Sequence, residues 1–394
     1  MSAVFLNELG LACALGRNRQ EVAQSVFAAD APRGVAICEQ LTPGRPLALG
    51  RVPGELPSLA HLPVAMHGRN NALLTLALEP IRASVEGAIA RFGRHRVAIV
   101  VGTSTSGVGE SEVAQRDLRR DGRWPDGFHY AQQEMGTPAQ FLSTVLGVSG
   151  PAQVISTACS SSAKALATAA RLLRSGMADA VLAGGADSLC AFTIAGFSAL
   201  GSVSAARCDP FSRNRCGINI GEGAALFLMT RDEGPVRLAG WGESSDAHHM
   251  SAPDPTGRGA ESAIDDALRR AGITSAAIDY VNLHGTATPH NDAMEAMVMN
   301  RLLPADTPMS STKPLTGHAL GAAGAIEAAL CWISLAENPQ RRRLPHWWDG
   351  EADPDLPGLH LVSPGESSGR ALRYALSQSF AFGGSNAALV LGAE

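Results

Sequence analysis

Four short, uninterrupted apolar runs in the first half of the chain constrain its fold more than any other feature. They lie at residues 97–101, 152–155, 180–183 and 224–229. Runs of this length, without polar alternation, are typical of strands that are buried on both faces of a sheet. Helical stretches separate the runs, and this alternation of strands with helices predicts a layered α/β fold.

The second half of the chain repeats this plan. Its strand-like segments are residues 278–283, the residues around Ser310, and residues 387–391. The string GEGAALFLMTRD resembles GGSNAALVLGAE, and the small-residue helix after Cys159 resembles the helix after His318. Two related pairs in the same order favour an internal duplication. We therefore expect two halves, residues 1–232 and 233–394.

Two stretches interrupt the alternation of strands and helices. Residues 31–63 and 339–357 are rich in turn-forming residues, which predicts loops. Across the whole chain, 42 glycines and a content of only 5% aromatic residues favour close packing of backbones over a core of large side chains.

The composition excludes several classes of protein. A chain of 394 residues with 45% hydrophobic and 18% charged residues has enough apolar material for a large core and is not disordered. The net charge of −5 and the absence of a long basic run argue against nucleic acid as a partner. No apolar stretch reaches the roughly 18 residues of a membrane span, and the N-terminus lacks the basic start of a signal peptide. Seven cysteines without a CxxC pair indicate reduced thiols and a cytoplasmic protein.

The string VISTACSSSAKALATAARLLRSG carries the strongest candidate for chemistry. A strand leads into Cys159, and an Ala/Leu-rich helix continues to Ser175, with Gly176 as its stop. The unpaired N–H groups and positive dipole at a helix N-terminus favour a thiolate and can bind an oxyanion. The alternative is a buried structural cysteine, which is also what we expect of the other six cysteines.

A nucleophilic cysteine needs a base or a charge stabiliser, and two of the eleven histidines are candidates. The string LHGTATPHND places His284 directly after a strand. The string SSTKPLTGHALGAAGA places Lys313 five residues before His318, which opens a Gly/Ala-rich helix. Histidines at strand and helix ends among small polar residues often face a cleft. The histidines expected at the surface or in loops are His61, His67, His95, His129, His248, His249, His346 and His360.

Six strings together resemble the motif series of the β-ketoacyl-acyl-carrier-protein synthases. They are TACSSSAKAL, LAGGAD, GINIGEGAA, HGTATPHND, STKPLTGHALGAAG and SFAFGGSNAALV, in the order of that family. The likeness runs from about Val97 to the C-terminus and is to the elongating Cys-His-His enzymes. It implies a thiolase-like, five-layered αβαβα fold made of two duplicated halves, with the nucleophilic cysteine in the first half and both histidines in the second.

The resemblance also implies a mechanism. Cys159 would take an acyl chain from the phosphopantetheine of a carrier protein. His284 and His318 would drive the decarboxylation of malonyl-carrier protein and stabilise the enolate. The backbone amides of Cys159 and Phe382 would bind the oxyanion, Phe382 would gate the cysteine, and Phe197 would line the acyl pocket. No metal and no organic cofactor is implied.

Four further residues match supporting positions of the family. Lys313 matches a lysine that orients and tunes the second histidine. Glu295 matches a glutamate that partners this lysine. Thr286 and Thr288 match threonines that hydrogen-bond the pantetheine arm.

Two departures from the family pattern affect the gating loops. Ala381 stands at the middle glycine of SFGFGG, where a β-carbon would restrict the backbone. The usual FDxxRDGF is here FSRNRCGI, in which Ser212 and Cys216 replace acidic residues of that loop's salt bridges. These features resemble the specialised synthases of aryl-polyene or polyketide-type clusters more than a housekeeping fatty acid enzyme.

The expected function is a decarboxylative Claisen condensation that gives 3-oxoacyl-acyl-carrier protein, in fatty acid or aryl-polyene/polyketide synthesis. The expected partners are an acyl carrier protein and a second subunit, in a homodimer or in a heterodimer with a chain-length-factor-like chain. Arg116, Arg119 and Arg120 are the densest basic cluster for docking the acidic carrier.

Several alternatives depend on features that the chain lacks. A thiolase-type coenzyme A acyltransferase needs a second cysteine where the chain has SFAFGGSNA. A chain-length factor lacks the nucleophile. A carrier-protein interpretation of Ser188 in GGADSL conflicts with its place inside the synthase pattern. A zinc site at His284 and His290 lacks a third ligand at a suitable spacing.

Overall fold

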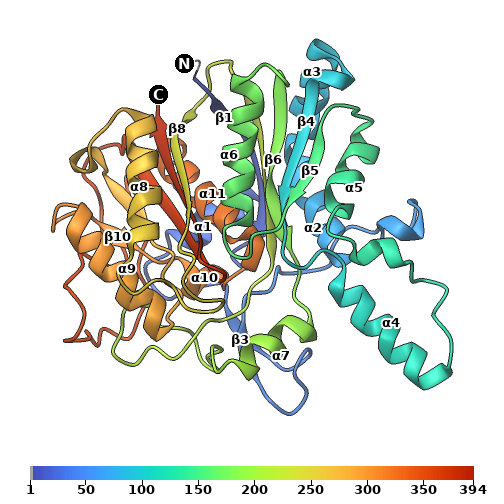
Figure 1. Ribbon diagram of the computed structural model, residues 1–394, viewed down its shortest axis with the longest axis horizontal. Helices are drawn as coiled ribbons and strands as arrows, with labels where there is room; N and C mark the ends of the chain where they lie inside the picture. Colours follow the sequence, from blue (N-terminus) through green and yellow to red (C-terminus); the bar gives the residue numbers. More distant parts are fainter. Residues whose placement is uncertain (1–2) are drawn as a thin grey trace.

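A computed structural model describes residues 3–394, and ten of its strands form one mixed sheet (Figure 1). The strands are β1 (Phe5–Cys13), β2 (Ala36–Cys38), β3 (Leu47–Leu49), β4 (Val97–Gly102), β5 (Ala152–Ile155), β6 (Ala180–Asp187), β7 (Gly223–Thr230), β8 (Val236–Ser245), β9 (Tyr280–Asn282), β10 (Met309–Ser310), β11 (Tyr374–Ala381) and β12 (Ser385–Ala393). The helices are α1 (Arg19–Val26), α2 (Arg69–Leu78), α3 (Arg82–Phe92), α4 (Val108–Asp121), α5 (Thr137–Leu146), α6 (Ser161–Arg174), α7 (Ala191–Ala199), α8 (Arg258–Ala271), α9 (Pro289–Leu302), α10 (Lys313–Thr316) and α11 (Ala323–Ala336). Among residues 3–394, every helix is too short or too polar to cross a bilayer.

The ten-stranded sheet consists of two blocks with the same order and direction of strands. The first block runs β5-β4-β6-β7-β1 and the second runs β10-β9-β11-β12-β8. In each block the first three strands are parallel and the last two join antiparallel. The blocks meet only where Phe5 and Leu6 of β1 pair with Arg237 and Val236 of β8. The predicted duplication is thus confirmed, and we propose that the halves divide between residues 232 and 233, in the connection from β7 to β8.

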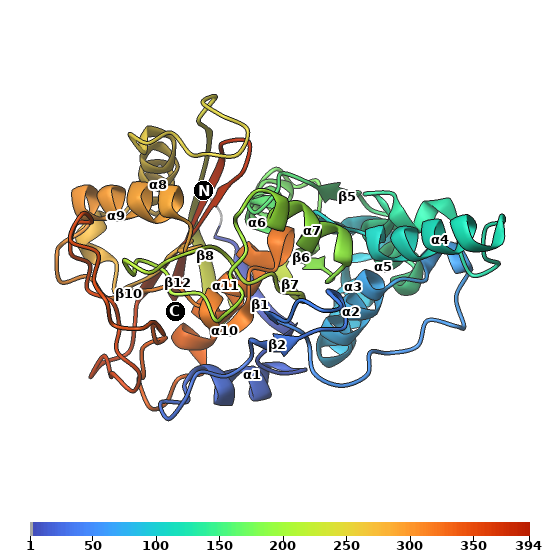
Figure 2. The same cartoon turned by 90° about the horizontal axis from the view of Figure 1, so that it is seen from below.

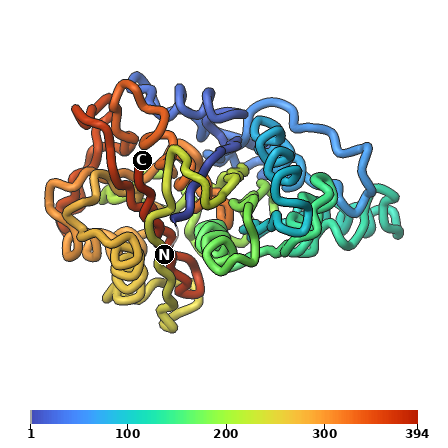
Figure 3. Tube along the Cα trace, turned by 90° about the horizontal axis from the view of Figure 1, so that it is seen from above, coloured from blue at the N-terminus to red at the C-terminus, as the bar shows by residue number. Residues whose placement is uncertain are grey.

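Helices and sheet blocks alternate in five layers (Figure 2). Helices α2, α3 and α5 cover the outer face of the first block, and α8 and α9 cover the outer face of the second. Helices α6 and α11 lie between the two blocks. Strand β4 demonstrates burial on both faces: Val97 and Ile99 pack with the outer helices, whereas Ala98 and Val100 pack in the middle layer. Helix α4 projects from one end of the molecule (Figures 2 and 3).

The apolar runs locate some strands and miss others. The runs at residues 97–101, 152–155, 180–183 and 224–229 lie in β4, β5, β6 and β7. Strands β8 and β11 were not predicted because glycine and polar residues interrupt their apolar pattern. In β8 the absence of a side chain at Gly240 allows α8 to pack closely against the strand. A β-carbon on Gly240 would lie 2.0 Å from the Ala267 carbonyl oxygen of α8.

The prediction that residues 31–63 form only a loop is wrong, because this stretch contains β2 and β3, which pair with each other. All three residues of β3 are buried, and Leu47 and Leu49 pack against Ile218 and Ile220. Residues 339–357 do form a loop without helix or strand, as predicted.

His346 was expected at the surface or in a loop; it does lie in the loop at 339–357, but it is not at the surface. It is 1% exposed, and its Nδ1 accepts from the Ser311 N–H at 3.0 Å, while its Nε2 lies 3.1 Å from the Pro210 carbonyl oxygen. Burial lowers the pKa of His346 to about 4. The side chain therefore ties the loop at 339–357 to the strand ends while neutral.

We predict that alanine at two helical glycines changes stability in opposite directions. At Gly324 of α11 a β-carbon would lie 2.9 Å from the Ala163 Cβ of α6, so Gly324→Ala should lower the free energy of unfolding by about 1–3 kcal/mol. At Gly87 of α3 a β-carbon meets nothing within 4 Å, so Gly87→Ala should raise it by about 0.5–1 kcal/mol. Urea unfolding of both variants measures the difference, and equal changes would contradict the close approach of α6 and α11.

We also predict that His346 makes the protein sensitive to acid. The folded-state pKa of about 4 lies below the usual 6.5, so the unfolded chain binds the proton first as the pH falls. Stability attributable to this residue is therefore lost between pH 6.5 and 4, by up to about 3 kcal/mol. Urea unfolding across this range should give a shallower pH dependence for His346→Gln than for the wild type. His95→Gln, at an exposed position, controls for the loss of a histidine; an unchanged slope in His346→Gln would refute the prediction.

Candidate active site

The turn between β5 and α6 presents Cys159. Ala158 has φ of 53°, a left-handed conformation that alanine rarely adopts. Hydrogen bonds hold the turn: the Thr157 N–H donates to Ser161 Oγ at 2.9 Å, and that hydroxyl donates to the Ala158 carbonyl oxygen at 2.6 Å. Strained residues held in this way cluster at functional sites. The result is that Cys159 lies at the N-terminal end of α6 with 5% of its surface exposed.

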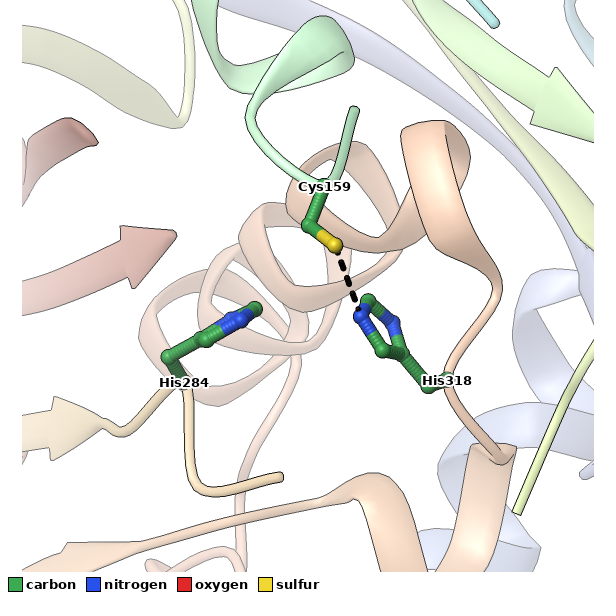
Figure 4. A group of neighbouring side chains, drawn as sticks. All are labelled: Cys159, His284 and His318. Atoms are coloured by element: carbon green, nitrogen blue, oxygen red, sulfur yellow. Dashed lines mark hydrogen bonds between the residues drawn. The ribbon is translucent and has the colours of Figure 1, made fainter. Parts of the chain in front are cut away.

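Two histidines from the second half of the chain face Cys159 (Figure 4). His318 follows α10, and its Nε2 lies 3.0 Å from Cys159 Sγ. His284 follows β9, and its ring is perpendicular to that of His318, with 5.4 Å between centroids. One ligand atom from each of the three residues lies within 4.8 Å of the others. The two halves of the fold thus bring together three side chains that are far apart in sequence.

Lys313 was expected to orient the second histidine, His318, but it contacts the first, His284. Its Nζ donates to the His284 carbonyl oxygen at 2.5 Å and lies 3.3 Å from His284 Nδ1. Burial, and then the charge of Lys313, lower the pKa of His284 and of His318 well below the usual value. Because an ammonium group can only donate, Nδ1 of His284 accepts, which leaves the proton of the neutral ring on Nε2.

The Cys159 thiol is protonated at rest, contrary to the expectation that a helix N-terminus favours a thiolate. Burial raises its pKa to about 11, and the opposing effects of Lys313 and of the Phe382 backbone N–H are smaller. Attack by the sulfur therefore requires a proton acceptor. The neutral imidazole of His318 lies within hydrogen-bond distance of the sulfur.

The expected pairing of Glu295 with Lys313 is wrong. Lys313 instead forms an ion pair with Glu327 of α11, and both side chains are almost completely buried. Glu295 accepts from the backbone N–H groups of His284 at 2.6 Å and Gly285 at 2.7 Å, so it holds the loop that carries the histidine. The signal for Glu327 was present in the sequence, because it is the only charged residue in the apolar helix α11.

The cavity above these residues has a volume of about 250 Å³. Phe197 and Phe382 lie on its wall with ring centroids 5.7 Å apart. Thr286 and Thr288 also line it, and their hydroxyl groups share a hydrogen bond of 2.9 Å. All four residues singled out for gating, acyl and pantetheine contacts therefore border one cavity with Cys159. Their roles remain predictions.

The segment FSRNRCGI, expected to be the second gating loop, contacts carboxylates of the loop at 339–357. The contacts are Arg213 with Glu351, Asn214 with Asp349, and Arg215 with Asp353. Within this segment Cys216 was expected to fill the core, and that is wrong: Cys216 is exposed and lines the cavity.

Ala381 does not strain the first gating loop. It is the last residue of β11 and pairs with Ser385 of β12. The left-handed residues of this turn are Gly383 and Gly384, with φ of 84° and 73°. Ala381 therefore has a strand conformation that alanine adopts readily, and the expected restriction of this loop by its β-carbon is not observed.

The separations among Cys159, His284 and His318 are also short enough for a shared metal ion. The ammonium group of Lys313 lies 3.3 Å from His284 Nδ1, and a cation beside this positive charge is electrostatically disfavoured. The site therefore suits a reaction that develops negative charge.

Comparison with known proteins agrees with this geometry. Residues 76–234 match the family described as "Beta-ketoacyl synthase, N-terminal domain", and residues 236–341 match "Beta-ketoacyl synthase, C-terminal domain". A ketosynthase from Xenorhabdus doucetiae, ApeO, solved in complex with its chain length factor ApeC, is 44% identical with a TM-score of 0.93, over 100% of this chain and 98% of that one. A β-ketoacyl synthase from Burkholderia phymatum is 26% identical with a TM-score of 0.88, over 100% of both chains.

Sequence relatives point in the same direction. The 3-oxoacyl-[acyl-carrier-protein] synthase 2 of Vibrio cholerae is 32% identical over 315 residues, which are 75% of this chain and 75% of the relative. The protein of the same name from Rhizobium meliloti is 37% identical over 263 residues, 61% of each chain. With its nucleophile, histidines and thiolase-like fold in place, the chain belongs to the β-ketoacyl synthase family and is an acyltransferase.

Proposed function

We propose that the protein condenses an acyl group held on Cys159 with malonyl-acyl-carrier protein and releases 3-oxoacyl-acyl-carrier protein. The observation that carries the proposal is the approach of His318 Nε2 to within 3.0 Å of Cys159 Sγ, with His284 beside them at the bottom of one cavity.

The first step is transfer of the acyl group. As the sulfur of Cys159 attacks the thioester carbon, its proton moves to His318 Nε2. The tetrahedral oxyanion accepts hydrogen bonds from the backbone N–H groups of Cys159 and Phe382. The carbon–sulfur bond to pantetheine breaks, the pantetheine thiolate takes the proton from His318, and the acyl group remains on the enzyme.

The second step is decarboxylation and condensation. Loss of CO₂ from the malonyl thioester places negative charge on its carbonyl oxygen, and the Nε2–H of His284 donates to it. This hydrogen bond forms in a buried site, where it stabilises charge more than in water. The α-carbon then attacks the acyl-Cys159 thioester, a carbon–carbon bond forms, and the Cys159 thiolate leaves. A proton from solvent water restores the Cys159 thiol.

We further propose a chain-length-factor-like partner, in an aryl-polyene or polyketide-type pathway. The similarity to ApeO, solved with its chain length factor, supports a heterodimer over a homodimer. Strand β5 is an edge of the sheet next to Cys159, and Ala152 and Gln153 of this edge are exposed. An open strand edge is a template for pairing with another chain. The edge of β5 is therefore the proposed contact.

Docking of the acidic carrier protein at α4 is a further part of the proposal. Arg116, Arg119 and Arg120 are all exposed on this projecting helix. Arg120 is paired with Asp117 and Asp121, which reduces the positive charge that it presents. We therefore assign steering of the carrier mainly to Arg116 and Arg119. A carrier-dependent synthase with seven free cysteines suits the reducing cytoplasm.

A thiolase-type coenzyme A acyltransferase is the second candidate, because Cys216 places a second thiol on the cavity wall. Cys216 is exposed, and its sulfur is 3.3 Å from Ser204 Oγ. The histidines and not this thiol face Cys159, so the condensing function is favoured. An interpretation of the chain as a carrier protein is disfavoured because Ser188 is only 2% exposed.

The proposal is tested by the intact mass of the protein after mixing with acyl-carrier thioesters of several chain lengths, with and without a candidate chain-length factor. We expect one acyl adduct on the wild type and none on Cys159→Ala. Cys331→Ala, at a buried cysteine outside the cavity, is the matched control and should keep the adduct. An adduct on Cys159→Ala would refute the assignment, as would its absence from the wild type under every condition.

We predict that the two histidines matter for different half-reactions, His284 for decarboxylation and His318 for acyl transfer. His284→Ala removes the donor to the enolate oxygen, and loss of one such donor typically slows a reaction by about 10²–10³-fold. His318→Ala removes the acceptor for the Cys159 proton and should slow acylation more than CO₂ release. Rates of CO₂ release from malonyl-carrier protein and of adduct formation measure the two steps separately. Equal losses in both steps would contradict the roles given to these residues, whereas Cys159→Gln should still release CO₂.

A further inference from the structure

The chain uses lysine at only two positions. Of its 32 basic residues, Lys164 and Lys313 are the only lysines and all others are arginines. Lys313 contacts His284 in the active site. Lys164 lies on α6, five residues after the nucleophile, and no step proposed above uses it. A compact ammonium group on a flexible stem makes different contacts from the planar guanidinium group of arginine.

Lys164 lies one helical turn after Ser160, and its backbone N–H donates to the Ser160 carbonyl oxygen at 3.0 Å. Residues four apart lie on the same face of a helix. Lys164 Nζ reaches past Ser160 and donates to Ser385 Oγ at 2.6 Å. A hydrogen bond from a charged donor is stronger than a neutral one.

Ser160 completes a link between two turns. Its side chain is completely buried, and its hydroxyl donates to the Thr157 carbonyl oxygen at 2.8 Å and shares a hydrogen bond of 3.0 Å with Ser385 Oγ. Thr157 belongs to the turn that presents Cys159, and Ser385 begins β12. The side chains of Lys164 and Ser160 thus connect the nucleophile turn to the first residue of β12.

Ser385 is only three residues from the gating phenylalanine. The turn between them is tight, because the Gly384 N–H donates to the Ala381 carbonyl oxygen at 3.0 Å. Phe382 and Cys159 line the same cavity, and the Phe382 backbone N–H opposes the effect of burial on the pKa of the Cys159 thiol. A displacement of Ser385 therefore moves the Phe382 N–H relative to Cys159.

Two backbone hydrogen bonds hold the opposite side of this turn. The Gly383 N–H donates to the Met250 carbonyl oxygen, and the Asp246 N–H donates to the Gly384 carbonyl oxygen, both at 2.8 Å. Neither contact reaches the nucleophile turn. The alignment of Phe382 with Cys159 from the α6 side depends on the hydrogen bonds that meet at Ser385.

We propose that Lys164 is a positioning residue, which holds Ser385 and thereby aligns the Phe382 backbone N–H with the oxyanion formed at Cys159. This inference rests on the proposed function and deepens it. It assigns Lys164 to acyl transfer, where the Phe382 N–H binds the oxyanion. Decarboxylation places its charge at His284 and does not use this donor.

The experiment compares the two half-reactions in Lys164→Met, which keeps an unbranched side chain but has no N–H donor. We expect adduct formation to slow by about 10–100-fold, since small misplacements of a catalytic group have effects of this size. CO₂ release from malonyl-carrier protein should stay within about twofold of the wild type. Arg171→Met, two turns further along α6, removes a positive charge that is paired with Glu243 and should change neither rate.

Ser385→Ala tests the same link from its other end and keeps the proposal testable if Lys164→Met does not fold. It should slow acyl transfer to a similar extent. The double variant should be no slower than the slower single variant, because both changes break one link. Equal slowing of both half-reactions, additive effects, or unchanged acyl transfer would overturn the proposal while leaving the proposed function intact. A wild type without either half-reaction would overturn the proposed function itself.

Discussion

The ammonium group of Lys313 lies almost completely buried between the second sheet block and α11. It forms an ion pair with Glu327 and donates to the carbonyl oxygen of His284. Removing one partner of a buried ion pair typically costs about 3–5 kcal/mol, because the other charge is left uncompensated. The Lys313–Glu327 ion pair therefore contributes both to the stability of the second half of the chain and to the electrostatics of His284. The same charge fixes the proton of His284 on Nε2 and lowers the pKa of both histidines.

The duplicated fold explains why the reacting groups meet. Cys159 lies two residues before the central helix α6, and His318 lies in the segment that joins α10 to the central helix α11. These helices pack so closely that Gly324 has no space for a side chain beside Ala163. His284 comes from the end of β9, at the same side of the middle layer. A decarboxylating condensation needs a nucleophile next to donors for developing negative charge, and this arrangement supplies both from rigid elements.

Contacts with neighbouring segments hold the two segments that were expected to gate the cavity. The loop at 339–357 supplies the carboxylates that the second gating loop lacks, through Glu351 and Asp353. At the first gating loop, Ala381 continues β11 while the following glycines form the turn. The loops that border the cavity are thus tied to the surrounding structure by contacts specific to this chain, and Lys164 adds such a contact from α6.

The sequence by itself determined the layered α/β fold, the duplication, and the identity of Cys159, His284 and His318, because local apolar runs and long motifs encode these features. It did not determine β8 and β11, because glycine and polar residues interrupt their apolar pattern. The partner of Lys313, the burial of His346 and the exposure of Cys216 were likewise decided by tertiary structure. Each of these depends on which side chains from distant segments lie within a few ångströms of one another. Local sequence does not determine such contacts.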